Sequence, residues 1–485
     1  MKMHHTFHRI EATDRARALP WLLVLLACAA AALWIGWIGF EASDDSLYWQ
    51  GAMKVMTQPP FAGDNHWTTR FPLTLTFAAV LRTIGEGFAA FAVTAMIFYA
   101  VVVAVTGAFA AKVVGARAGW IAALLTATLP VIVSHATTVS VDLIEAAALV
   151  LGVMLLGGAR ADRAGYVRGV AAGIMFGVAV LCRETSVLPL VGLVPLFVLG
   201  RPVPRGVLIA AGVGVAVVLG GEALYQWALT GDPLRRYTIA FNHDDHIDRA
   251  ANMEGNFLLW PPIDPLLVLI INDDFGLLFW IAGAAMTLGA WGLVPRAQRP
   301  RMVVLAAMAG AMFVLVAVLY GKLVLNPRYF TLPALAAVVI VATWVARLAA
   351  VWRVILLTVL VSSNLLLMGV GNAHPRWVME AMVEASAAHP REVIAADPQT
   401  VRRALIPMLY AGRENLRYAP ARAGGLEIAE ADRAPAGQVL ARYPSPPTRV
   451  GAMLRTLGLE PLVPGAVARR MFAPSPEAVL VRRSS

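Results

Sequence analysis

The feature that most constrains this chain is a succession of uncharged apolar runs, each close to the length of a membrane-crossing helix. A helix needs about 20 residues to cross the hydrocarbon core of a bilayer. The sequence therefore predicts an all-α polytopic membrane protein with about eleven transmembrane helices, over residues 21–40, 87–111, 118–134, 275–295, 302–321, 329–346 and 354–373 and, as shorter runs, 146–159, 169–182, 185–200 and 206–221. A further apolar stretch, Phe257–Asn272, is broken by prolines and an acid, and we expect it to lie in the membrane interface or to re-enter.

Composition supports this interpretation, because 59% of the 485 residues are hydrophobic and only 14% are charged. A soluble protein carries about 25% charged residues. The first run, from Trp21 to Phe40, exceeds the roughly 7–15 apolar residues of a cleaved signal peptide, and no clean small-residue cleavage site ends it. We therefore expect this run to be the first transmembrane helix.

Basic residues recur in small clusters between the apolar runs, although the net charge is +10. Clusters of this kind are membrane topology signals, and they argue against a nucleic-acid partner. If residues 1–19 are cytoplasmic, the inner loops contain Lys112, Arg117, Arg160, Arg163, Arg168, Arg201, Arg205, Arg296, Arg299, Arg301, Arg347 and Arg353. The opposite face contains the acids Asp44, Asp45, Asp64, Asp142, Asp244, Asp245, Asp248, Asp273 and Asp274. We therefore expect the C-terminus to be extracytoplasmic.

The chain divides into a transmembrane domain over 20–371, with long outer loops over 41–86 and 222–274, and a tail over 372–485. The composition of the tail shifts abruptly to charged and Pro/Gly-rich segments. A tail of about 110 residues is long enough to hold its own core. Its pattern predicts a small α/β domain with a helix near 400–409 and strands near 393–396, 415–418, 438–443 and 478–481.

An acidic pair, Asp44 and Asp45, opens the first outer loop directly after the first predicted span. Two adjacent carboxylates at the membrane surface can hold a divalent cation or accept a proton from a substrate hydroxyl. The alternative is a helix terminus, since Ser43 or Asp44 is a favourable N-cap residue and acids favour a first turn. The residues alone leave both interpretations open.

Basic and aromatic residues follow in the same loop, where His66, Trp67 and Arg70 precede Pro72. Arginine presents a planar fork of donors to phosphate oxygens, so this segment suits a phosphate or sugar site. Alternatively, the segment anchors the loop at the headgroup level.

Charged residues also lie at the outer ends of short predicted spans, namely Asp142, Glu145, Arg183 and Glu184. Fourteen residues of helix reach only about 21 Å, so these span ends are expected near membrane depth. Ionisable groups there are costly and usually functional. The alternative is a structural ion pair between Asp142 and Arg183.

Two further clusters have a functional and a structural interpretation. The histidines and carboxylates of residues 242–248 suit either a metal or a solvated polar loop, and no regular ligand spacing supports the metal. Arg328, followed by Tyr329, suits either a lipid phosphate or a helix anchor.

Together these segments resemble the GT-C class of membrane glycosyltransferases. They are most similar to the large bacterial group related to protein O-mannosyltransferases, aminoarabinose transferases and lipopolysaccharide galacturonosyltransferases. The resemblance covers roughly residues 20–350. It depends on the order and the membrane side of the motifs Asp44-Asp45-Ser-Leu-Tyr48, Arg70-Phe71-Pro72-Leu73, Asp142, Leu181-Cys182-Arg183 and Gly231-Asp232-Pro233-Leu234.

The resemblance implies transfer of a sugar from a polyprenyl-phosphate donor to a lipid, glycan or protein acceptor at the outer face of the bacterial inner membrane. It implies that Asp44 is the general base and that Asp45 orients Asp44 or shares a cation with it. The expected substrate-binding residues are Tyr48, Arg70, Asp142, Arg183, Arg328 and Tyr329.

The motifs also depart from the family pattern. Relatives commonly have Asp-Glu where this chain has Asp44-Asp45, and often Pro-Pro-Leu where it has Phe71-Pro72-Leu73. Where some relatives have an acid before the basic residue, this chain has Thr69. A divalent cation such as Mg²⁺, Mn²⁺ or Zn²⁺ is a candidate cofactor, with Asp44 and His66 as its tentative ligands.

Other classes explain part of the pattern. A lipid or sugar transporter or flippase accounts for the spans, but it predicts inverted repeats with broken helices near the middle of the membrane. A membrane-anchored binding protein would place the activity in the tail. A lipid-linked polymerase or ligase also uses outer loops with Arg and His.

Overall fold

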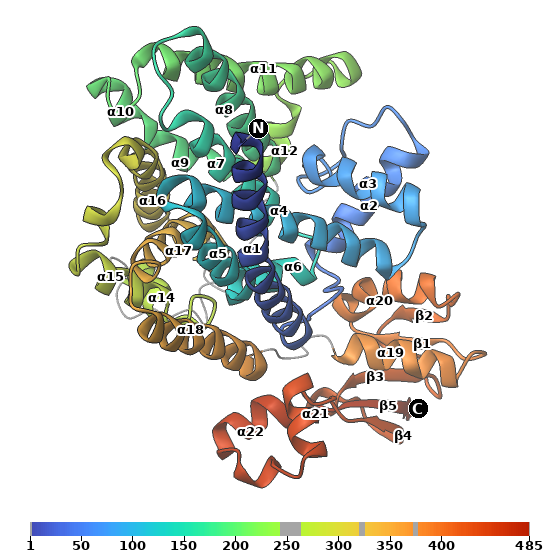
Figure 1. Cartoon of the computed structure of the whole chain (residues 1–485). Coiled ribbons are helices and arrows are strands. Elements are labelled where there is room, and N and C mark those ends of the chain that lie inside the picture. Colours follow the sequence, from blue (N-terminus) through green and yellow to red (C-terminus); the bar gives the residue numbers. More distant parts are fainter. Residues whose placement is uncertain (1, 243–262, 320–324, 372–376, 485) are drawn as a thin grey trace.

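The computed structural model describes residues 2–242, 263–319, 325–371 and 377–484 (Figure 1). Every apolar run expected to span the membrane appears in it as one or more helices. These helices are α1 (Lys2–Ile35), α4 (Phe88–Val114), α5 (Ala116–Thr128), α6 (Pro130–Thr137), α7 (Asp142–Leu156), α8 (Arg163–Cys182), α9 (Val187–Val191), α10 (Leu193–Leu199), α11 (Arg205–Thr230), α15 (Leu278–Thr287), α16 (Arg299–Leu319), α17 (Thr331–Val345) and α18 (Ala350–Gly371).

Among the described residues, 7 helices are long and apolar enough to cross a membrane, or up to 8 if the bent pair α5–α6 is one span. The bend of 61° falls where Pro130 begins α6. Leu129 before it is extended, as the residue preceding a proline usually is. The other predicted runs form the shorter helices α7, α9, α10 and α15, so fewer helices pass the length criterion than the eleven runs predicted.

The remaining elements of this part of the chain come mainly from the two predicted outer loops. From the first outer loop come α2 (Asp44–Thr57) and α3 (Phe71–Ile84), and from the second come α12 (Arg235–Asn242) and α14 (Asp264–Ile271). Short 3-10 turns cover 184–186, 290–293, 296–298, 327–330, 431–433 and 460–462. The segment predicted to be interfacial or re-entrant is described only from residue 263 onward, where it forms α14. The polar cluster 243–248 lies outside the described residues.

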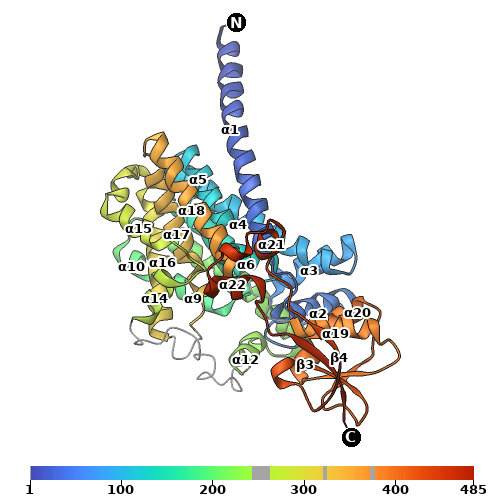
Figure 2. The ribbon, with the colours of Figure 1, turned by 90° about the horizontal axis from the view of Figure 1, so that it is seen from below.

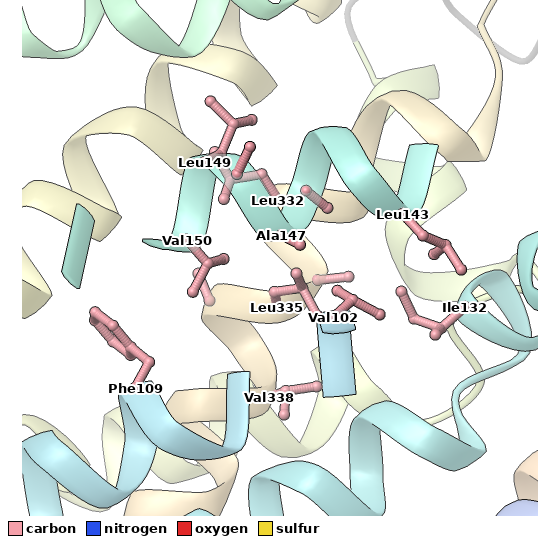
Figure 3. Packing of buried hydrophobic residues seen from close by; sticks show 14 of the residues in the cluster. Val102, Phe109, Ile132, Leu143, Ala147, Leu149, Val150, Leu332, Leu335 and Val338 are labelled. Atoms are coloured by element: carbon pink, nitrogen blue, oxygen red, sulfur yellow. The ribbon is translucent and has the colours of Figure 1, made fainter. Parts of the chain in front are cut away.

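The core of the bundle is where α4, α7 and α17 meet (Figure 3). Val102 and Phe109 of α4 point toward Ala147 and Val150 of α7, and Leu335 of α17 completes the packing (Figure 3). Elsewhere the helices approach through small residues, as membrane helices commonly do. A Cβ atom on Gly173 of α8 would lie 1.8 Å from the carbonyl oxygen of Ala211 in α11. Only glycine therefore allows this contact between α8 and α11.

Charged residues of the predicted loops gather at the two opposite ends of the bundle. At one end, Arg168 donates a hydrogen bond to the carbonyl oxygen of Leu155 (2.9 Å), and Arg301 packs against Gly157 and Gly158. The acids Asp44, Asp142 and Asp274 line one cavity at the other end. Figure 2 shows the N-terminus and the C-terminal sheet on opposite sides of the bundle. The grouping of charge along the sequence therefore corresponds to two separate ends in space.

The tail forms the expected small α/β unit. Its five-stranded sheet has the order β2-β1-β3-β5-β4, with β1 parallel to β2 and β3, and β5 antiparallel to β3 and β4. The strands are β1 (Ile394–Ala396), β2 (Leu416–Tyr418), β3 (Leu426–Glu430), β4 (Gly437–Tyr443) and β5 (Ala478–Arg483), and the helices are α19 (Trp377–Ala388), α20 (Pro398–Tyr410), α21 (Arg449–Thr456) and α22 (Gly465–Phe472). The pattern predicted four of these strands and α20, but it missed the central strand β3.

We expect the N-terminus to lie in the cytoplasm and the C-terminal unit outside, because the basic inner loops and acidic outer loops occupy opposite ends. An alkaline phosphatase reporter fused after Gly371 should be active, and the same reporter fused after Arg160 should be inactive. Phosphatase activity from the Arg160 fusion alone would contradict this orientation.

Candidate functional site

The candidate site is a cavity of about 400 Å³ at the end of the bundle where the first outer loop, α6, α7 and the 3-10 turn before α17 meet. Its wall is mainly polar and is contributed by segments that are distant in the sequence. The polar residues that line it include Glu41, Asp44, Asp45, Tyr48, Ser134, His135, Ser140, Asp142, Asp274, Asn326 and Arg328.

The two adjacent acids have different surroundings. The Asp45 carboxylate is buried and accepts hydrogen bonds from the backbone N–H groups of Glu41 (2.6 Å), Ser43 (2.8 Å) and Ser46 (2.9 Å). Asp44 is partly exposed, and its carboxylate lies 3.6 Å from the guanidinium group of Arg328. Thus Asp45 holds the turn that begins α2, whereas the Asp44 carboxylate is the more exposed of the two.

Burial raises the pKa of the Asp45 carboxyl to about 6, while the three backbone donors act in the opposite direction. A raised pKa alone would suit a general base. Both Asp45 oxygens already accept from the backbone, however, and a base must be within hydrogen-bond reach of the proton that it removes. Geometry therefore favours Asp44 for contact with a substrate.

Arg183, which follows α8, forms a buried ion-pair cluster with two acids of α7. Its guanidinium lies 2.8 Å from Asp142 and 3.7 Å from Glu145. The hydroxyl of Ser186 donates to Glu145 at 2.6 Å, and Arg183 also stacks over the ring of Tyr329 at 5.1 Å. The structural ion pair between Asp142 and Arg183 is therefore present in the protein.

Arg70 belongs to a second buried network. It donates to the hydroxyl of Tyr48 and contacts the ring nitrogen Nε2 of His66. The other ring nitrogen of His66 lies 3.8 Å from Glu184, and Glu184 lies 2.7 Å from Arg236. This chain of contacts connects the first outer loop to the break after α8 and to α12.

Of the three arginines among the expected substrate-binding residues, Arg328 lines the cavity, whereas Arg70 and Arg183 do not. Arg70 lies behind Tyr48, whose ring it overlies at 5.7 Å, and Arg183 pairs with Asp142. Arg183 and Arg328 both overlie the ring of Tyr329, at 5.1 and 5.8 Å. The three guanidinium groups thus surround Tyr48 and Tyr329, with one of them at the cavity surface.

Among the described residues, Asp44 and His66 do not form the cation site expected from the sequence. Asp44 faces Arg328, whereas the ring of His66 faces Arg70 and Glu184. Within the described parts of the chain, no group of three or more His, Cys, Asp or Glu side chains is arranged to hold a metal ion.

Two residues that contact the site, His135 and Arg236, were not predicted from the sequence. His135, in the helix that Pro130 turns away from α5, lies 3.6 Å from Asp142. Arg236, fully buried, donates to the carbonyl oxygens of Thr69 (2.6 Å) and Leu181 (2.9 Å) as well as pairing with Glu184. The proline inside an apolar run was a signal for the first. Arg236 gave no signal, because its partners are distant in the sequence.

The structure defines a polytopic membrane protein with a polar cavity, and its fold resembles those of solved membrane proteins. No family model matches the chain, and no curated protein matches it. Among solved structures, the chain is similar to ArnT from Cupriavidus metallidurans bound to undecaprenyl phosphate, with a TM-score of 0.60 and 14% identity over 87% of this chain and 96% of that one. The apo state of ArnT gives a TM-score of 0.58, also at 14% identity, over 88% of this chain and 96% of that one.

A second similar structure is the Archaeoglobus fulgidus oligosaccharyltransferase in complex with Zn and sulfate. It has a TM-score of 0.53 and 14% identity, over 79% of this chain and 61% of that one. The GT-C fold expected from the sequence is therefore confirmed.

We expect Arg183→Met to destabilise the protein strongly, because it leaves Asp142 and Glu145 buried without their cation. Removing one partner of a buried pair typically costs about 3–5 kcal/mol. Arg328→Gln is the matched control, since its pair with Asp44 is partly exposed and such pairs contribute about 0–1 kcal/mol. Thermal unfolding midpoints in detergent should fall for the first variant and not for the second. Equal midpoints would show that the cluster has no structural role.

Proposed function

We propose that this protein is a glycosyltransferase that moves a sugar from a polyprenyl-phosphate donor to an acceptor hydroxyl at the outer face of a bacterial inner membrane. The observation that carries the proposal is the pair formed by Asp44 and Arg328, whose side chains lie 3.6 Å apart in the lining of one polar cavity. One side chain can take a proton and the other can hold a phosphate. The GT-C fold, and the undecaprenyl phosphate bound to the similar ArnT structure, support the same donor class.

In the proposed reaction, Asp44 and Arg328 have different tasks. Asp44 accepts the proton of the acceptor hydroxyl as its oxygen bonds to the anomeric carbon of the sugar. The bond from that carbon to the phosphate oxygen breaks, and the bond's electrons leave with the polyprenyl phosphate. Arg328 stabilises the charge on this leaving phosphate. The acceptor is a lipid, a glycan or a protein.

The same proposal gives supporting roles to the buried residues. Asp45 positions Asp44 by holding the backbone of residues 41–46. Tyr48 is held by Arg70, and Tyr329 is overlaid by both Arg183 and Arg328. In this proposal both tyrosines contact the donor phosphate, because a phenol hydroxyl can donate a hydrogen bond to it; Tyr48 lines the cavity.

A cation has no assigned step in this proposal. The similar oligosaccharyltransferase structure contains Zn, but around Asp44 in this chain the neighbouring charge is Arg328, and the oxygens of Asp45 are already bonded. Arginine therefore supplies the positive charge at the leaving phosphate.

We expect Asp44→Asn to abolish transfer while leaving folding intact. Asparagine is nearly isosteric but cannot accept the proton, and loss of a general base typically lowers the rate about 10²–10⁴-fold. The measurement is transfer of radiolabelled sugar from polyprenyl-phosphate donors by membranes containing the protein. The matched control is Asp64→Asn in the same loop, where an exposed acid pairs with Lys54. Near-normal transfer by Asp44→Asn, with lowered expression of Asp44→Ala, would make the residue structural.

We expect Arg328→Gln to weaken donor use, because one charged hydrogen bond to phosphate contributes about 1.5–3 kcal/mol. The KM for the lipid donor should rise about 10- to 100-fold, and Arg328→Lys should recover part of the loss. Arg82→Gln, an exposed arginine at the end of α3, is the control. An unchanged KM in Arg328→Gln would place the phosphate elsewhere.

A further inference from the structure

The segment from Arg449 to Phe472 forms a helical hairpin of α21, the 3-10 turn 460–462 and α22, which is inserted between strands β4 and β5 of the C-terminal sheet. We refer to it as the juxtamembrane hairpin. It does not pack on the sheet alone, because α21 and α22 contact the end of α18, and α21 also contacts α1 (Figure 1). This hairpin contributes no residue to the lining of the candidate site.

Specific contacts fix the hairpin to the ends of two candidate spans. Thr448 Oγ1 donates to the carbonyl oxygen of Gly369 at 3.2 Å, and Arg449 donates to the carbonyl oxygen of Trp34 at 3.0 Å. Gly369 and Trp34 lie within the last turn of the candidate spans Ala350–Gly371 and Ala18–Ile35. If these two helices cross the bilayer, their last turns lie near the lipid headgroups, and the hairpin lies at the same level.

Large apolar side chains of the hairpin point away from the protein. Leu457 is 61% exposed and Leu462 is 78% exposed, and Met453 on α21 is exposed as well. Isolated exposed leucines are ordinary on a surface. Here they follow one another along one short hairpin, and Trp34 and Leu366 are exposed on α1 and α18, the two candidate spans that the hairpin contacts. Large apolar side chains are therefore exposed both on the hairpin and on the helices beside it.

The charged residues of the hairpin also suit a position at the membrane surface. Arg455 forms an ion pair with Glu460 at 2.9 Å, which braces the turn between the two helices. Arg469 and Arg470 on α22 are exposed, and among the described residues neither forms a salt bridge. A basic residue near an anionic membrane surface gains about 1 kcal/mol.

We propose that the juxtamembrane hairpin is an interfacial anchor that binds the outer leaflet of an anionic phospholipid bilayer. Leu457 and Leu462 insert among the acyl chains just below the headgroups, and Arg469 and Arg470 bind lipid phosphates. Short helices with an apolar face and basic residues commonly lie in the membrane interface in this way. The anchor ties the C-terminal sheet to the membrane independently of the identity of the donor or the acceptor.

The test uses the full-length protein in lipid nanodiscs, with Cys28→Ala as background so that the remaining native cysteine, Cys182, is buried. A fluorescent probe is attached at Leu462→Cys or, as the control, at Val439→Cys, an exposed position on β4. Lipids brominated near the headgroup end of the acyl chain quench fluorophores at that depth. Quenching should be at least several-fold stronger at position 462 than at position 439.

A second comparison tests the charges. In nanodiscs that contain phosphatidylglycerol, quenching at position 462 should exceed that in phosphatidylcholine alone. The double variant Arg469→Gln/Arg470→Gln should lose this difference. Equal, weak quenching at positions 462 and 439 in both lipids would overturn the proposal. The proposal would also be overturned if the probe became protected as the protein concentration rises while the lipid did not quench it. That result would assign the surface to a second copy of the chain.

Discussion

The buried ion pair between Arg183 and Asp142 is the interaction on which the outer end of this protein depends. It joins the end of α8 to the start of α7, and Glu145 and Tyr329 are held against the same guanidinium group. A buried charge is tolerated only with its partner, so the two helix ends cannot separate without a large cost. One wall of the polar cavity is therefore fixed by this ion pair.

The acidic pair shows how neighbouring residues with the same chemistry take different roles. The Asp45 side chain turns inward, and its oxygens accept hydrogen bonds from backbone N–H groups. These bonds fix the direction in which Asp44 points. The sequence could predict that only one acid would face a cavity, because adjacent side chains on a helix diverge. It could not show that Asp44 would face an arginine from the turn before α17, since that contact spans most of the chain.

Much of the fold is predictable because it follows local patterns. The apolar runs marked the membrane helices, and alternating or helical patterns marked four strands and one helix of the tail. The strand Leu426–Glu430 was missed, although Leu426 and Ile428 lie two residues apart on either side of Glu427 and are buried in the sheet. The site was predictable only as a set of residue types, because Arg236 and His135 take part through contacts across distant segments.

The C-terminal unit is connected to the site more closely than its place in the sequence suggests. Ala42 and Phe40, from the loop that carries Asp44, pack into the core of that unit with Met379 and Met382. Tyr410 of α20 packs edge-on against Trp49 of α2 and Phe88 of α4. The loop of Asp44 is thus held on one side by the first span and on the other by the sheet unit. Because the juxtamembrane hairpin fixes that unit to α1 and α18, the position of Asp44 depends on the C-terminal unit as well as on the membrane bundle.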